Sequence, residues 1–155
     1  MKRNSLIKGQ SMFEVVFALG IIALITVAIV SVSTVAIRNN ISAKNKSLSG
    51  KYLNEMNEWL RNERDKSFPT FYAHGSNVGN KYCIDEINGG WSGAHPGSCG
   101  PSDYIPNTTF LRGFTLTTFT YANSQKAVSA SAYVQWNDAQ GFHEARSVTV
   151  YTDWE

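Results

Sequence analysis

One carboxylate, Glu14, stands at the head of a long apolar segment, residues 15–37, that contains no charged side chain. As an α-helix this segment would reach roughly 34 Å, which is enough to cross a hydrocarbon core of about 30 Å. A carboxylate at the edge of a bilayer is costly unless another group pairs with it. We therefore expect Glu14 to have a partner, and ion pairing is the chemistry that this stretch can carry.

The residues ahead of Glu14 indicate how a cationic partner could arise. Residues 1–9 form a basic leader without an acid, and its charges are on Lys2, Arg3 and Lys8. A secretory signal peptide is cut after its apolar core, whereas the only cleavage-like position here, Gly9, precedes that core. A cut after Gly9 would leave the hydrophobic helix on the mature chain and create a terminal amine at Gln10. In a stack of subunits, Glu14 could pair with the amine of a neighbour in a low dielectric.

This arrangement resembles the type IV prepilin signal, in which a short basic leader ends in Gly and the fifth residue of the mature chain is Glu. In this sequence the match runs from Lys8 and Gly9, across the cut, through Gln10 to Glu14, and the apolar segment follows. The resemblance implies cleavage by prepilin peptidase on the cytoplasmic face and N-methylation of Gln10. It also implies docking with other pilin or pseudopilin subunits at an inner-membrane assembly platform. The family usually has Phe where this chain has Gln10.

Charge and length limit the classes of function. The chain of 155 residues can hold one small domain besides a membrane helix. Its net charge of +2 becomes −1 when the three cations of the leader are removed. No cluster of Lys and Arg suggests a nucleic-acid-binding face. Cations flank the apolar segment equally on both sides, so the cytoplasmic location of the N-terminus follows from the resemblance rather than from charge.

Cys83 and Cys99 lie beyond the apolar segment. If this part of the chain faces an oxidising compartment, a disulfide is the favoured interpretation, and closing a loop of this size would contribute roughly 3 kcal/mol. The alternatives are two free thiols or half of a metal site. The two cysteines lack the paired C-x-x-C spacing of zinc sites.

Helical periodicity continues past the apolar segment, and we predict one helix over residues 11–66. In its second half the apolar residues recur at steps of three, four and seven and form one stripe, with charges on the other side. The stripe comprises Ile41, Leu48, Tyr52, Leu53, Met56, Trp59 and Leu60. Glu63 falls on the stripe as an exception. Met56 and Trp59 are expected to pack against a sheet.

The composition changes after the predicted helix. Residues 67–106 are rich in Gly, Pro, Ser and Asn, which predicts loops, with one short strand at residues 81–85. Three strands are predicted at residues 110–121, 128–136 and 143–154. Short turns at 123–126 and 138–141 join them. Val128, Ala130, Ala132, Val134 and Trp136 form the apolar face of the middle strand, and Val148 and Val150 share a face with Trp154. A slip of apolar parity predicts a bulge near Thr117 or Thr118.

These elements predict an α+β fold, in which a small antiparallel β-meander packs on the second half of one long N-terminal helix. The predicted division is a leader at 1–9, the helix at 10–66 with a transmembrane part at 15–37, and a head at 67–155. This arrangement agrees with the pilin architecture. The cysteine-bearing loop and the final strand also resemble the heads of minor pilins of the PilV and pseudopilin I type.

The sequence offers little support for catalysis. His74, His95 and His143 are scattered, and neither H-E-x-x-H nor G-x-S-x-G occurs. Asp85, Glu86 and Asp103 could in principle bind calcium, but they form no ladder of ligands. We therefore expect no catalytic residue, no metal and no cofactor.

The resemblance implies a minor pilin or pseudopilin that primes or caps a type IV pilus or a type II secretion pseudopilus. Such a subunit would lie in the cytoplasmic membrane with its head outside, and in a surface filament after assembly. Systems for secretion, for adhesion or motility and for DNA uptake share this N-terminal helix. The alternative is a single-pass membrane protein with an extracytoplasmic binding module, in which Gly9 and Glu14 are incidental.

Overall fold

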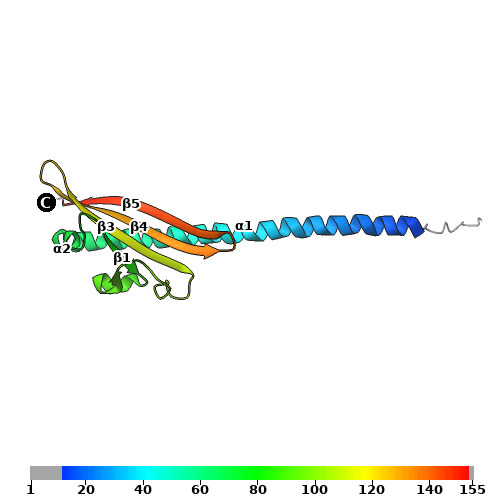
Figure 1. Ribbon diagram of the computed structural model, residues 1–155, viewed down its shortest axis with the longest axis horizontal. Helices are drawn as coiled ribbons and strands as arrows, with labels where there is room; N and C mark the ends of the chain where they lie inside the picture. The colour runs from blue at the N-terminus through cyan, green and yellow to red at the C-terminus, as the bar shows by residue number, and fades with distance from the viewer. Residues whose placement is uncertain (1–11, 154–155) are drawn as a thin grey trace, which may run out of the picture. The chain divides into compact units, whose positions relative to one another are not determined.

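The computed structural model describes residues 12–153, so that Gly9, Gln10 and Trp154 lie outside the described part of the chain. The chain divides into two compact units, Met1–Ile41 and Ser42–Glu155. The elements are α1 (Met12–Lys66), α2 (Phe68–Ala73), β1 (Asn80–Ile84), the 3-10 segment η1 (Ile87–Gly93), β2 (Ala94–Pro96), β3 (Phe110–Thr120), β4 (Lys126–Asp138) and β5 (Gly141–Thr152) (Figure 1). The predicted α+β fold is confirmed.

The long helix α1 confirms the prediction of a single helix over residues 12–66, and residue 11 lies outside the described part of the chain. No proline interrupts it, and it runs without a break through both Gly20 and Gly50. It ends where Ser67 turns to an extended conformation and its side chain accepts a hydrogen bond from the backbone N–H of Thr70. The same serine therefore closes α1 and caps the next helix.

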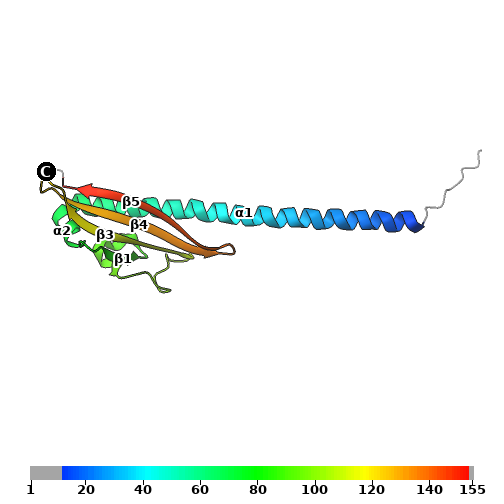
Figure 2. The same ribbon diagram turned by 45° about the horizontal axis from the view of Figure 1, so that its top comes forward.

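The strands form one antiparallel sheet in the order β2-β1-β3-β4-β5. The predicted meander is β3, β4 and β5, which lie side by side in Figure 2. The strands β4 and β5 are joined by a two-residue turn, since Asp138 lies opposite Gly141 in the register. Gly141 has a φ of 116°, which a residue with a side chain rarely adopts.

The predicted bulge near Thr117 or Thr118 is wrong. The register between β3 and β4 is continuous from Phe110 opposite Trp136 to Thr120 opposite Lys126. Phe119 instead lies on the sheet face away from α1, where its ring contacts that of Tyr121 with 5.2 Å between centroids. An aromatic pair on the outer face, and no extra residue, causes the change of apolar parity.

The prediction of loops over residues 67–106 is wrong in part. The predicted strand at 81–85 is β1, but this stretch also contains α2, η1 and β2. In α2, Pro69 occupies the first turn, where its missing N–H costs nothing, while Phe68 and Phe71 are buried. These two rings belong to the hydrophobic core of the head.

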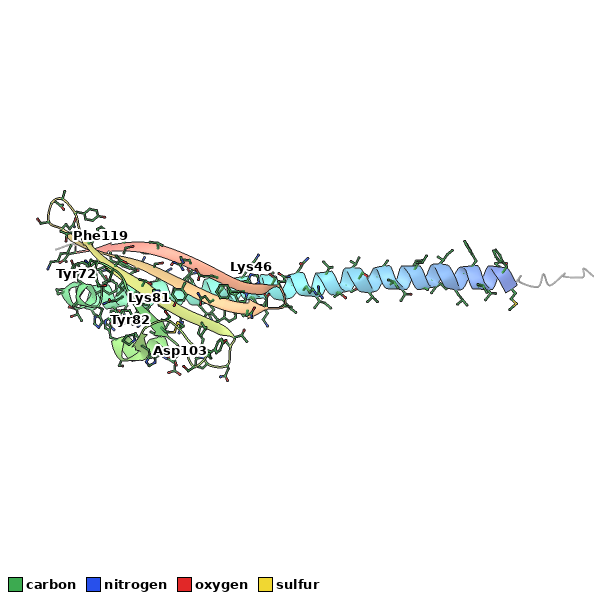
Figure 3. All side chains as sticks on the ribbon, viewed as in Figure 1. Lys46, Tyr72, Lys81, Tyr82, Asp103 and Phe119 are labelled. Atoms are coloured by element: carbon green, nitrogen blue, oxygen red, sulfur yellow. A yellow bond between two sulfur atoms is a disulfide. The ribbon has the colours of Figure 1, made fainter. Side chains whose placement is uncertain are left out.

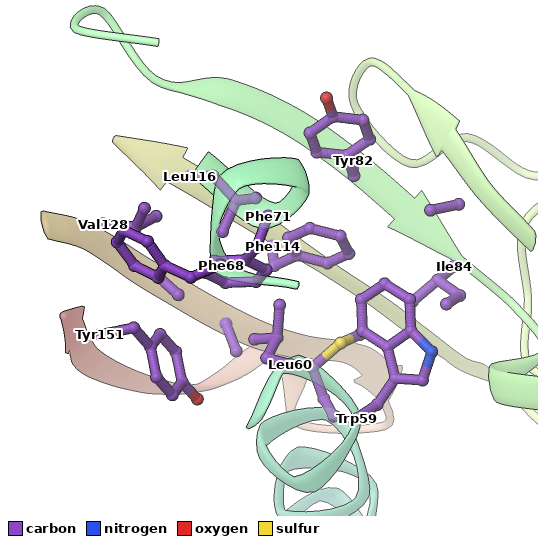
Figure 4. Close-up of a cluster of buried hydrophobic side chains, with 14 residues drawn as sticks. Trp59, Leu60, Phe68, Phe71, Tyr82, Ile84, Phe114, Leu116, Val128 and Tyr151 are labelled. Atoms are coloured by element: carbon purple, nitrogen blue, oxygen red, sulfur yellow. The ribbon is translucent and has the colours of Figure 1, made fainter. Parts of the chain in front are cut away.

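The core of the head lies between the second half of α1 and the sheet (Figure 4). Met56, Trp59 and Leu60 on α1 are buried, as predicted for the first two, against Phe114 and Leu116 of β3. A second cluster contains Phe110, Val134 and Trp136 together with Ile105, and Leu48 and Tyr52 of α1 pack against it. Burying one such side chain contributes about 1.5–3 kcal/mol, so the stripe on α1 organises the head.

Trp91 of η1 covers one edge of this core. Its ring contacts Trp59 at 5.3 Å and Phe114 at 6.1 Å between centroids. It also stacks on His74, with 3.6 Å between centroids and 9° between planes. The carbonyl of His74 accepts hydrogen bonds from the Tyr82 hydroxyl at 2.8 Å and the Asn80 amide at 2.9 Å. The glycine-rich stretch around Trp91 is thus held to α1 and α2.

We predict that Leu60→Ala lowers the free energy of unfolding by about 2–5 kcal/mol, because Leu60 is fully buried and its truncation leaves a cavity. The matched control is Val148→Ala, since Val148 is 63% exposed. We expect that change to stay within about 0.5 kcal/mol. Urea unfolding of the detergent-solubilised full chain, followed by near-UV circular dichroism, measures both. Equal losses would contradict the assigned core.

Candidate functional site

The N-terminal half of α1 presents apolar side chains in every direction. All side chains of residues 12–41 are exposed, including Leu24 at 74% (Figure 3). The mean hydropathy reaches 2.9 over an 18-residue window, and none of that window is buried in the structure. The helix is long and apolar enough to cross a membrane. Exposed apolar surface of this extent requires lipid or protein to cover it.

The hydroxyl side chains of the apolar segment, residues 15–37, bond within the helix itself. Each hydroxyl donates to the carbonyl four residues earlier, at 2.8–2.9 Å, and the four residues are Thr26, Ser31, Ser33 and Thr34. An unpaired hydroxyl would be costly in hydrocarbon. Because these hydroxyls are already paired, the surface that the helix offers to its surroundings is effectively apolar.

Glu14 lies in the first turn of α1, where the partial positive charge of the helix N-terminus favours an acid. Among residues 12–153 no side chain forms an ion pair or hydrogen bond with it. Gly9 and Gln10, for which cleavage and methylation are predicted, lie outside the described residues. The pairing of Glu14 with an amine at Gln10 therefore stays a prediction.

Gly20 leaves a notch in the apolar surface. A shallow groove of about 500 Å³ runs past it, lined by Phe13, Val16, Phe17, Gly20, Ile21 and Leu24. No atom lies within 4 Å of the position where a Cβ at Gly20 would be. Small residues of this kind let a second helix approach closely in a membrane or a helical bundle.

The head contains a buried cation, Arg112, which the sequence analysis missed. It lies on the face of β3 that packs on α1, between Phe110 and Phe114, and is only 3% exposed. Its Nε and Nη2 donate to the carbonyls of Ile84 at 3.2 Å and Asp85 at 2.8 Å. Its Nη1 donates to Oε2 of Glu55 on α1 at 3.3 Å. One side chain thus joins α1, β1 and β3.

Burial lowers the pKa of Arg112 from its usual value, and the nearby carboxylate of Glu55 acts against that shift. An arginine remains protonated in proteins even so. The signal in the sequence was available, since Arg112 shares the parity of Phe110 and Phe114 along β3. A charge at such a position has either to be paired or to destabilise the head.

The predicted disulfide between Cys83 and Cys99 is formed, with 5.1 Å between the Cα atoms. Cys83 lies opposite Gly113 in the register of β1 and β3. A Cβ at Gly113 would come within 2.5 Å of the Tyr133 hydroxyl, so the glycine provides room for this ring beside the disulfide. Burial raises the pKa of Tyr133. The disulfide therefore links the loop after β2 covalently to strand β1 of the sheet.

The structure does not bring the three histidines together. His74 follows α2, His95 lies on β2, and His143 on β5 lies 3.0 Å from Asp138. Of the acids considered for calcium, Asp103 accepts a hydrogen bond from the backbone N–H of Gly100, and Asp85 accepts one from that of Glu86. Within residues 12–153 no group of three His, Cys, Asp or Glu side chains could hold a metal ion.

An open groove of about 1420 Å³ in the head runs between the polar side of α1 and η1. Its lining includes four cations and four acids, namely Lys46, Lys51, Lys66, Arg112, Glu55, Glu58, Glu63 and Glu86. The two sets balance, so the groove has no net charge that would select an ionic ligand. Several of these charges also pair with each other, as Lys66 and Glu63 do at 2.6 Å.

Comparisons of the chain with models of known protein families, with curated proteins and with solved structures find no match. The class of protein is therefore defined by the architecture alone. A long N-terminal helix is apolar in its first half, and its second half packs on an antiparallel sheet. This arrangement is consistent with a pilin-like, membrane-anchored protein.

We predict that Arg112→Lys lowers the free energy of unfolding by about 2–4 kcal/mol, because one ammonium group cannot serve two carbonyls and Glu55 in the same geometry. Arg146→Lys is the control, since the Arg146 side chain is exposed and pairs with Glu144. That change should cost less than about 1 kcal/mol. Thermal unfolding measures both, and equal effects would show that Arg112 does not brace the head.

Proposed function

We propose that this chain is a minor pilin or pseudopilin, a membrane-anchored subunit that acts by assembly and performs no reaction. The observation that carries this proposal is the contrast along α1. Its first half exposes apolar side chains all round, whereas one face of its second half is covered by the sheet. The exposed first half of α1 needs an apolar environment to cover it. The membrane is one such environment, and the same helices of other subunits can provide another.

The apolar half can serve in two environments. Before assembly it holds the subunit in the cytoplasmic membrane, with the N-terminus in the cytoplasm and the head outside. After assembly it packs among the helices of other subunits in a filament. The paired hydroxyls and the notch at Gly20 support both uses, since they suit close contact with lipid and with a neighbouring helix.

Processing creates the signal for docking. Prepilin peptidase removes residues 1–9, which frees the amine of Gln10 for methylation. Glu14, which has no partner among residues 12–153, then meets the amine of a neighbouring subunit. In a low dielectric an unpaired carboxylate is penalised more than a paired one, so the ion pair favours a subunit docked in register over one dispersed in lipid.

The head supports an extracytoplasmic location and a minor role. A disulfide persists in an oxidising compartment such as the periplasm. The head is small, and most of its buried residues cover α1. This small head favours a subunit that primes or caps a filament at the inner-membrane assembly platform. No cofactor is required for this role.

We predict that the mature protein begins at Gln10. Mass spectrometry of the intact protein, purified from membranes of cells that contain prepilin peptidase, would show the loss of residues 1–9, with or without a methyl group. The same protein from cells lacking the peptidase is the control and should retain Met1. An intact Met1 in both samples would contradict the proposal and favour a single-pass protein with an extracytoplasmic binding module.

We predict that Glu14→Gln reduces incorporation into sheared filaments by about tenfold or more, since an amide cannot form the ion pair. The variant should still resist extraction from membranes by alkaline carbonate, because residues 15–37 are unchanged. The control is Glu58→Gln, which removes an exposed carboxylate on the same helix. Immunoblots of filament and membrane fractions measure both effects. Normal incorporation of Glu14→Gln would contradict the assigned role.

A further inference from the structure

The strand β5 forms one edge of the sheet (Figure 1). Within residues 12–153 no other strand pairs with its outer side, and no loop backbone bonds to it. With twelve residues it is roughly twice as long as a typical strand. An unpaired edge presents a row of backbone N–H and C=O groups that another strand can join. The edge of β5 is therefore a candidate surface for pairing with a further polypeptide.

The register of β4 and β5 shows which backbone groups of β5 point outward. Asp138 lies opposite Gly141 across a two-residue turn, so these two residues exchange hydrogen bonds, and every second residue along β5 bonds to β4 in the same way. The residues between them, from Phe142 to Val150, turn their N–H and C=O groups toward the open edge. Their side chains are the exposed ones of the strand, whereas Tyr151, which has the opposite parity, is buried in the core.

The two edges of the sheet differ. The opposite edge is β2, which has three residues and ends at Pro96, a residue without a backbone N–H. Short strands and prolines are devices by which proteins protect an edge from pairing. In contrast, β5 contains no proline, and its register with β4 has no bulge. The sheet thus protects the β2 edge and leaves the β5 edge open.

The outward-facing residues of β5 divide into a charged part and an apolar part. In the first half of the strand, Glu144 and Arg146 pair with each other at 2.8 Å. In the second half, Val148 and Val150 are 63% and 47% exposed. No charge occurs in residues 147–152. An uncharged stretch with β-branched side chains favours pairing with another strand.

The order of these side chains argues against a second copy of β5 as the partner. Two β5 strands related by a two-fold axis pair antiparallel, so that one register fixes every cross-strand pair. The register that sets Glu144 opposite Arg146 of the other copy leaves Val150 opposite its turn. The register that sets Val148 opposite Val150 leaves Glu144 beyond the end of the other strand. No self-pairing therefore matches both parts, and β2 of another copy is too short to cover them.

We propose that the outward edge of β5 binds an extended segment of another protein, which joins the five-stranded sheet as a further antiparallel strand. The segment carries apolar side chains opposite Val148 and Val150, an acid opposite Arg146 and a base opposite Glu144. Backbone hydrogen bonds supply the affinity, and these cross-strand pairs supply the selectivity. All of these residues belong to the unit Ser42–Glu155, so the proposal does not depend on membrane anchorage.

Titration of the full chain in detergent with a synthetic peptide tests the proposal. The probe is the fluorescently labelled peptide Thr-Val-Thr-Val-Ser-Glu-Ser-Lys-Thr. In antiparallel pairing it places valine opposite both valines of β5, glutamate opposite Arg146 and lysine opposite Glu144. The matched control peptide has the same side chains but carries N-methyl groups on those four residues, so they cannot donate to the edge. Fluorescence polarisation measures the affinity for both peptides.

Val148→Pro is the corresponding change in the protein. It removes the outward N–H of residue 148, which β4 does not use, and a proline is tolerated at such a position of an edge strand. The control is Val148→Thr, which keeps both the N–H and the β-branched shape. Near-UV circular dichroism verifies that the head of each variant is folded. Val150→Pro repeats the test at the next outward residue.

We expect the chain to bind the unmodified peptide, and to bind the N-methylated peptide at least about tenfold more weakly, because several edge hydrogen bonds are lost. The two proline variants should weaken binding by a similar factor, whereas Val148→Thr should change it by less than about threefold. Absence of binding at about 1 mM peptide would overturn the proposal. Equal affinities of the proline and threonine variants would overturn it as well.

Hydrogen exchange measured by NMR adds a readout with a specific pattern. The peptide should slow exchange at the amides of Val148 and Val150, which face the edge, and leave that of Thr149, which bonds to β4, unchanged. Equal slowing at all three amides would indicate general stabilisation and contradict strand addition. A dimer of the chain that Val148→Pro dissociates in analytical ultracentrifugation would assign the edge to a second copy, and so overturn the proposal.

Discussion

The apolar stripe on the second half of α1 is the constraint on which the head depends. A helix with one apolar face cannot remain uncovered in water. Met56, Trp59 and Leu60 are buried because β3 and β4 turn their apolar faces toward them. Two of the three elements that we did not predict, α2 and η1, also contribute rings to this cover, through Phe71 and Trp91. The hydrophobic core of the head is therefore built around one face of α1.

Arg112 shows how the head tolerates a charge inside this cover. The strand β3 places it between two phenylalanines, where an unpaired cation would be strongly penalised. The end of β1 turns two carbonyls toward it, and α1 offers Glu55, which is still 41% exposed. The disulfide holds β1 at Cys83, next to this arrangement, and so fixes the carbonyls that Arg112 needs. These partners allow the charge of Arg112 to be buried in the core.

Hydrophobic periodicity predicted the elements that are long and regular. It failed where the contacts of a single side chain determine the local structure. The length of α1, the apolar face of β4 and the meander follow from patterns of 3.6 and 2 residues. The bulge was predicted wrongly because Phe119 was assumed to face the core, whereas it pairs with Tyr121 outside. The helix α2 could have been found, since Ser67 followed by Pro69 is a typical helix start. The position of Trp91 could not, because its contacts come from four separate elements.

If the subunit moves from lipid into a filament, hydrophobic burial cannot drive that step. Lipid tails cover an apolar helix as well as neighbouring helices do, so the exposed surface of residues 12–41 gains little from the exchange. The balance then falls to polar groups at the two ends of the apolar segment. Glu14 at one end has no partner among residues 12–153, and in the proposed pairing with the amine of another subunit it would favour docking. At the other end, the cations Arg38, Lys44 and Lys46 would favour the membrane through anionic lipid. An equilibrium set by a few such groups can be shifted by assembly proteins at a moderate cost in free energy.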